Sequence, residues 1–295
     1  MRGADGRKVL IGVRRWWADR RRSGRRPGAR RRAGRPTVGR DARALPAMLA
    51  TGSIRFAYAP VRRLTDSVVV GIRMCPQWPS DPGVDPRHAA RPDAARPDAD
   101  EHHRRLRRAA AAGGIADDLD RYVVESAARH LPSVVHGLQC DEPWLAVPIG
   151  ASSLESAEFV DGLLDRLDEQ GLTPEGFVFE LDRRPRGELE STAVDRLRDL
   201  GVWFSVPRWD AAEVQVAEAE FCVLDDDRHV DDDTRTLRRT VSASRRRALR
   251  TVAVATDAEH LVRLRRAGVE FAVESSRSSA SLGEIVGRVR TEHDL

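Results

Sequence analysis

The chain has 295 residues with a formal net charge of +4, a length that allows one large domain or two small ones around a hydrophobic core. No apolar run is long enough to span a membrane and no secretory signal opens the chain, so we expect a cytoplasmic protein. Cys75, Cys140 and Cys222 lack the spacing of a disulfide framework or a zinc site.

The N-terminal segment, residues 1–52, holds most of the positive charge. Residues 1–50 carry sixteen Arg and Lys against three Asp, a net charge of +13. Because this arginine-rich tail has no sustained apolar period, we expect it to be disordered. It is either a solvated tail, with Met48 as a candidate for the true start, or an arm for nucleic acid or an anionic membrane surface. We prefer the first, because charge runs most often mark solvated tails.

Residues 53–295 have the pattern of one α/β domain. Strands at 54–61 and 67–74, joined by a short polar turn, predict a β-hairpin. The stretch 79–107 is rich in Pro, Asp, Arg and Ala and predicts a disordered loop. Beyond the hairpin we expect strands at 144–149, 175–181, 202–206, 220–225, 251–255 and 269–273, and helices at 104–112, 116–131, 153–170, 188–200, 231–248, 257–267 and 281–292. This order predicts a closed barrel, with an open doubly wound sheet as the alternative.

Two of these strands end in residues that cannot do acid–base or metal chemistry. One strand runs into Pro148, and another runs into Pro207 and Arg208. In sheets of alternating strands and helices, catalysis is placed beyond the carboxyl ends of the strands. Because a proline side chain neither ionises nor binds a metal, these ends predict a site that has lost its reaction.

Several segments, taken in order, carry the motifs of one family in altered form. Residues 58–61 and 70–78 are similar to a Tyr-Gln-Pro-Ile opening and a Val-Gly-x-Glu-Ala-Leu-x-Arg-Trp signature. Residues 145–154 resemble a strand that ends in Asn-Leu-Ser, and 179–183 resemble a Glu-x-Thr-Glu strand. These are motifs of the EAL domain, the barrel that hydrolyses the bacterial second messenger cyclic di-GMP. The resemblance covers about residues 54–292 and implies a TIM-like (β/α) barrel that opens with a β-hairpin.

The departures from this family fall on its chemical positions. The resemblance implies two divalent cations, Mg²⁺ or Mn²⁺, held by carboxylates and an Asn, with a Lys that helps to place the attacking water. Those positions carry Arg73, Pro148, Pro207, Arg208 and Val223, and only Glu180 and Asp225 keep a ligand residue. Because the guanidinium of Arg73 stays charged, it would repel a cation in the site. We therefore expect no catalytic residue, no bound metal and no other cofactor, with Mg²⁺ or Mn²⁺ only if residual activity exists.

Three functional hypotheses follow from the resemblance. The first is a catalytically inactive EAL domain that serves as a regulatory or protein-interaction module in cyclic di-GMP-type signalling, with an unknown protein partner or a homodimer. The second is a non-hydrolytic cyclic di-GMP receptor in which Arg73 and Arg208 contact the phosphates, as arginine forks do. A residual phosphodiesterase ranks last, and nucleic acid is expected only at the N-terminal tail.

Overall fold

The computed structural model describes residues 34–79, 99–138, 140–182, 192–207, 219–224, 234–274 and 281–293. The chain divides into two units, residues 1–37 and 38–295, and the strands found in the described ranges belong to the second. None of the helices in the described ranges is both long and apolar enough to cross a membrane.

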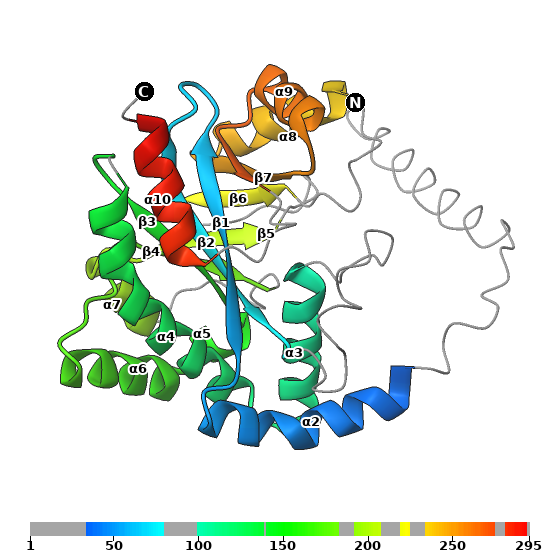
Figure 1. The fold of residues 1–295 in the computed structure, drawn as a ribbon, viewed down its shortest axis with the longest axis vertical. Coiled ribbons are helices and arrows are strands. Elements are labelled where there is room, and N and C mark those ends of the chain that lie inside the picture. The colour runs from blue at the N-terminus through cyan, green and yellow to red at the C-terminus, as the bar shows by residue number, and fades with distance from the viewer. Residues whose placement is uncertain are drawn as a thin grey trace, which may run out of the picture. The chain divides into compact units, whose positions relative to one another are not determined.

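Eight strands close into a barrel in chain order (Figure 1). They are β1 Arg55–Arg63, β2 Val69–Gln77, β3 Trp144–Ile149, β4 Phe177–Leu181, β5 Trp203–Pro207, β6 Phe221–Leu224, β7 Arg250–Ala255 and β8 Phe271–Glu274. β1 pairs antiparallel with both β2 and β8, whereas the remaining neighbours pair in parallel. The predicted hairpin and the closed barrel are confirmed, and the open sheet is wrong.

Helices follow the strands as the hydrophobic periodicity predicts. They are α2 Gly34–Ala50, α3 Ala99–Gly113, α4 Ala116–Gly137, α5 Ala151–Leu154, α6 Ala157–Glu169, α7 Thr192–Asp199, α8 Thr234–Arg245, α9 Ala258–Ala267 and α10 Leu282–His293. The helix expected at 153–170 is divided at Ser156, whose extended backbone ends α5. The Ser156 hydroxyl accepts a hydrogen bond from the Phe159 N–H at 3.2 Å and so begins α6 as its N-cap.

Two segments expected to be disordered contain helices. The tail expected to run to residue 52 includes α2, in which Leu45 is fully buried. The loop expected to run to residue 107 gives way to α3 at Ala99. Asp41 of α2 accepts two hydrogen bonds from Arg105 of α3, at 2.7 and 2.8 Å. The expectation was wrong here because tertiary contacts, rather than local propensity, stabilise these arginine-rich helices.

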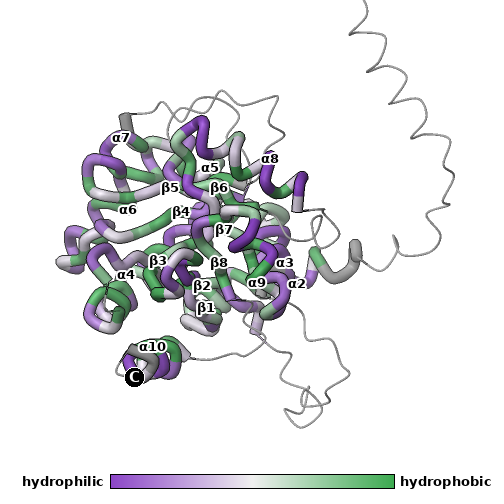
Figure 2. Tube along the Cα trace, turned by 90° about the horizontal axis from the view of Figure 1, so that it is seen from above, coloured by the Kyte–Doolittle hydropathy of each residue, from purple (hydrophilic) through white to green (hydrophobic). Residues whose placement is uncertain are grey.

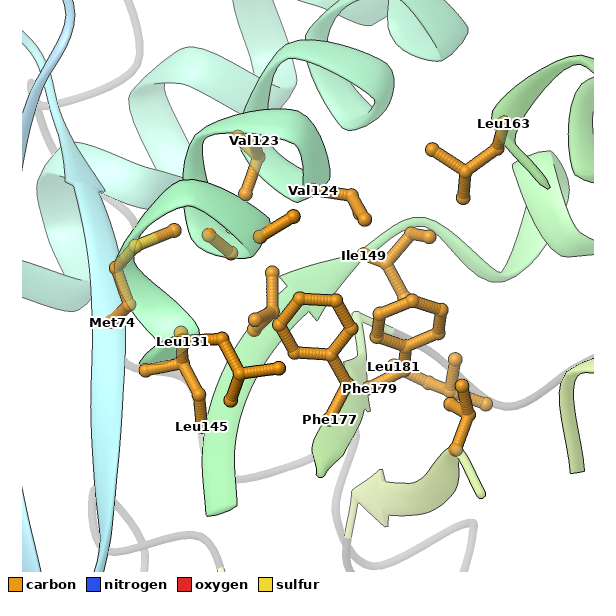
Figure 3. Close-up of a cluster of buried hydrophobic side chains, with 14 of the residues drawn as sticks. Met74, Val123, Val124, Leu131, Leu145, Ile149, Leu163, Phe177, Phe179 and Leu181 are labelled. Carbon is orange, nitrogen blue, oxygen red and sulfur yellow. The ribbon is translucent and has the colours of Figure 1, made fainter. Parts of the chain in front are cut away.

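The larger part of the core lies between the strands and the surrounding helices. Figure 3 shows side chains from α4, such as Val123 and Leu131, pointing toward Leu145 of β3 and Phe179 of β4. In Figure 2 the strands at the centre are mostly hydrophobic, while hydrophilic stretches gather on the outer helices. This alternation, with one strand face toward the helices and the other toward the barrel axis, fits the period of two in a strand.

A smaller aromatic cluster fills the barrel interior near the amino ends of the strands. Trp144 and Phe271 each lie against Phe221, with ring centroids 5.6 and 5.9 Å apart, respectively. Arg250 stands over the Phe271 ring at 4.5 Å. A Cβ atom added at Gly71 would lie 2.5 Å from the Trp144 ring, so only glycine leaves room for this indole.

Replacing Gly71 with alanine is therefore expected to lower the free energy of unfolding by about 1–3 kcal/mol, because the Trp144 ring must shift in a packed interior. Gly162→Ala is the matched control, since Gly162 lies in α6 with no atom within 4 Å of an added Cβ. That variant is expected to gain about 0.5–1 kcal/mol, the helix preference of alanine over glycine. Urea denaturation measures both, and equal effects would contradict the packing argument.

Candidate functional site at the carboxyl ends of the strands

Arg73 of β2 and Glu180 of β4 form an ion pair near the barrel axis. The Arg73 Nε atom lies 2.7 Å from Glu180 Oε2, and the two side chains are 18% and 11% exposed. In β3, which lies between them, Ala146 is in register with Arg73 and Pro148 is in register with Glu180. The structure thus brings together Arg73, Pro148 and Glu180, the positions that the sequence resemblance assigns to the signature Glu, the Asn and one carboxylate ligand.

Ser205 of β5 lies beside this ion pair. It is in register with Glu180 and is only 2% exposed. Its hydroxyl has no hydrogen-bond partner among the described residues. A buried hydroxyl without a partner costs on the order of 1–3 kcal/mol, so this group is available to a polar ligand.

The other positions singled out in the sequence supply apolar atoms or lie elsewhere. Ala59 of β1 is in register with Arg73, and Val223 of β6 is in register with Pro207. Neither side chain has an atom that ligates a hard cation. The predicted positions Arg208 and Asp225 lie outside the described residues.

The described residues do not fit a pair of divalent cations. Within the described ranges, no three His, Cys, Asp or Glu side chains gather closely enough to hold a metal. The one carboxylate at a family ligand position there, Glu180, accepts a hydrogen bond from Arg73. Two-metal hydrolysis requires several oxygen ligands that clamp both the attacking and the leaving oxygen, and this arrangement does not provide them.

A second polar cluster joins the ends of β3 and β4 to α3 and α4. Arg107 of α3 donates to Asp120 of α4 and, at 3.0 Å, to Asp182, which directly follows β4. Asp120 also accepts hydrogen bonds from the Gly150 N–H at 3.0 Å and from the Ser153 hydroxyl at 2.6 Å. We call these five residues the Arg107–Asp120 cluster. It holds the chain at the carboxyl end of β3 in place.

Burial and charge act against each other in this cluster. Burial raises the pKa of the Asp120 carboxyl, while Arg107, Ser153 and the Gly150 N–H oppose that shift by stabilising the carboxylate. Burial alone would lower the pKa of Arg107, but Asp120 and Asp182 raise it. A Cβ atom at Gly150 would lie 1.9 Å from the Arg107 guanidinium. Glycine is therefore needed for this close approach.

The sequence analysis does not identify the Arg107–Asp120 cluster, although the position of Asp120 in the sequence is a signal of it. Asp120 occupies the apolar face of α4, between Leu119 and Val123, with Val124 and Ala127 further along the same face. A charged residue on such a face is almost never fully buried without a partner. The partner, Arg107, could not be identified by spacing because it comes from a different helix.

The fold and this geometry can be compared with known proteins. The family model described as "EAL domain" matches residues 42–218. The chain belongs to the EAL domain family. The match begins inside α2, which supports the correction that this helix is part of the domain rather than of the tail. A sequence comparison with characterised proteins finds no significant match.

Solved structures of EAL domains share this fold. The EAL enzyme Bd1971, in a form with cAMP and cyclic di-GMP bound, matches with a TM-score of 0.68 at 15% identity, covering 97% of this chain and 76% of that one. The MucR phosphodiesterase in complex with cyclic di-GMP gives 0.65 at 15% identity, with 83% and 99% covered. The FimX EAL domain of Xanthomonas citri, also bound to cyclic di-GMP, gives 0.58 at 17% identity, with 82% and 93% covered.

Proposed function

We propose that this EAL domain does not hydrolyse cyclic di-GMP and instead acts as a regulatory or protein-interaction module in cyclic di-GMP signalling, through a protein partner or a second copy of the chain. The observation that carries the proposal is the ion pair of Arg73 with Glu180. A guanidinium stands at the position of the signature Glu and neutralises a carboxylate that would otherwise face a cation. The family membership supports the signalling context.

The positive charge of Arg73 makes binding of a cation in this site energetically unfavourable. At an effective dielectric of about 20, two like unit charges 4 Å apart repel by about 4 kcal/mol, and a divalent ion roughly doubles that value. An arginine cannot escape this repulsion by losing its proton. A cation would therefore have to displace Arg73 from Glu180, leaving the guanidinium without its carboxylate in a mostly buried place.

The test is incubation of the full chain with cyclic di-GMP and either Mg²⁺ or Mn²⁺, with the linear dinucleotide as the measured product. We expect no product, and no change of melting temperature on adding either ion. Arg73→Ala is a second sample, because it frees Glu180 without restoring the other ligands; it too should give no product. Metal-dependent release of the linear dinucleotide by the unmodified chain would overturn the proposal.

A second candidate function, non-hydrolytic binding of cyclic di-GMP, is favoured by the Ser205 hydroxyl. This group is buried without a partner among the described residues, beside a guanidinium that could donate to phosphate. Calorimetry without metal tests the candidate. Arg73→Ala and Ser205→Ala should each weaken binding, whereas Arg62→Ala, which breaks an ion pair with Glu274, should not. If titration with cyclic di-GMP gives no heat, the interaction module is the one proposal that remains.

A further inference from the structure

Helices α8 and α9, with the segment between them, carry a concentration of positive charge that the proposed function does not use. Residues 234–268 contain ten arginines and two carboxylates, a net charge of +8. The other residues of 51–295 together carry a net charge of −17. A charge separation of this size within one domain creates a positive electrostatic potential that attracts polyanions.

Six exposed arginines lie on these two helices or directly after α8, and we refer to them together as the α8–α9 arginine surface. Its members are Arg238, Arg239, Arg245, Arg246, Arg265 and Arg266, all of them exposed. α8 and α9 lie side by side in Figure 1, at the end of the barrel away from α2. Their last turns lead into the amino ends of β7 and β8, so the surface is remote from Arg73 and Glu180.

Backbone carbonyl groups, rather than carboxylates, hold three of these guanidinium groups. Arg245 donates to the Gly268 carbonyl at 2.8 Å, and Arg238 donates to the Arg266 carbonyl at 3.2 and 3.3 Å. Arg265 donates to the carbonyl of Thr65, in the turn between β1 and β2, at 3.3 Å. A neutral acceptor fixes the direction of a guanidinium but leaves its charge uncompensated.

Interactions of arginines with helix carboxyl ends account for only part of this surface. Arginines near the carboxyl end of a helix stabilise its last carbonyls and its dipole, which explains Arg238 and Arg245 at the end of α9. It also covers Arg266, in the last turn of α9, and Arg246, directly after α8, but it does not explain Arg239 in the middle of α8. No carboxylate within the described ranges forms an ion pair with any of the six arginines.

We propose that the α8–α9 arginine surface binds the phosphate backbone of nucleic acid. Guanidinium groups bind phosphate oxygens in a bidentate manner, and backbone contacts of this kind need no apolar centre. A protein partner or an inserted membrane anchor would need such a centre, and of the large hydrophobic side chains on α8 and α9 only Val262 is exposed. Binding of this type is independent of nucleotide sequence and weakens steeply with salt.

The experiment measures fluorescence anisotropy of a labelled DNA duplex about two helical turns long between about 50 and 200 mM salt. It compares the full chain with the triple variant Arg239→Glu/Arg246→Glu/Arg266→Glu, which spares the three arginines anchored to carbonyls. We expect affinity to fall at least about tenfold and the salt slope to decrease by about 3, one unit for each lost phosphate contact. The control, Arg43→Glu/Arg55→Glu/Arg129→Glu, makes the same charge change at exposed positions on α2, β1 and α4.

Four results would overturn the proposal. Equal losses in the two triple variants would show only a general effect of charge. Binding that survives the α8–α9 variant but disappears when Arg20, Arg21, Arg22, Arg30, Arg31 and Arg32 become Gln would assign it to the N-terminal segment. Binding of phosphatidylserine vesicles without binding of DNA would identify a membrane surface. Self-association that only the α8–α9 variant abolishes, without DNA binding, would identify a second copy as the partner. Circular dichroism melts verify that each variant is folded.

Discussion

Replacing Asp120 by alanine is expected to lower the free energy of unfolding by about 3–5 kcal/mol, the usual cost of removing one partner of a buried ion pair. The side chain is 1% exposed and accepts hydrogen bonds from Arg107, Gly150 and Ser153. Its loss leaves the Arg107 guanidinium, itself 13% exposed, with Asp182 as its carboxylate partner among the described residues. Urea denaturation of the full chain measures the change.

Asp118→Ala is the control for this prediction. Asp118 lies on the same helix but is 59% exposed, and its ion pair with Arg121 is long, at 3.8 Å. An exposed pair of this kind contributes about 0–1 kcal/mol. Asp120→Asn separates charge from shape, since an amide can still accept from Gly150 and Ser153 but cannot neutralise Arg107. Similar losses for Asp118→Ala and Asp120→Ala would contradict the role of the Arg107–Asp120 cluster.

A chain that begins at Met48 is expected to be less stable than one that begins at Gly34 by at least about 2–5 kcal/mol, the cost of losing one large buried side chain. The shorter chain lacks Leu45, which is fully buried in the core, and Asp41, which pairs with Arg105. The Arg105 guanidinium that Asp41 binds also stands over the Trp78 ring at 4.3 Å, so loss of Asp41 removes one of the contacts that position it. Thermal and urea denaturation of the two truncated chains measure the difference.

Point variants of the complete chain separate the packing of α2 from any effect of truncation. Leu45→Ala should lower the free energy of unfolding by about 2–5 kcal/mol. Leu200→Ala should change it by no more than about 0.5 kcal/mol, because Leu200 is 45% exposed. Equal stability of the two truncated chains would contradict the burial of α2.

The barrel could be predicted because its strands are short apolar runs bounded by clear breaks. The strand expected at 144–149 has these bounds in the structure, and the Gly268 that ends α9 has the left-handed backbone typical of a helix stop. The beginnings of helices were less predictable. Ser156 divides α5 from α6 by a local side-chain cap, and α3 begins within a segment whose composition resembles a loop.

Periodicity and side-chain chemistry are local properties, so the order of strands and helices, and the presence of Arg73 and Pro148 on the strands, can be read along the chain alone. What those residues contact depends on how the elements pack in three dimensions. Arg73 and Glu180 are 107 positions apart and meet only because β2 and β4 flank β3 in a closed barrel. The same holds for α2, for the Arg107–Asp120 cluster and for the α8–α9 arginine surface. Their contacts join separate elements, and the spacing of residues along one segment carries no information about them.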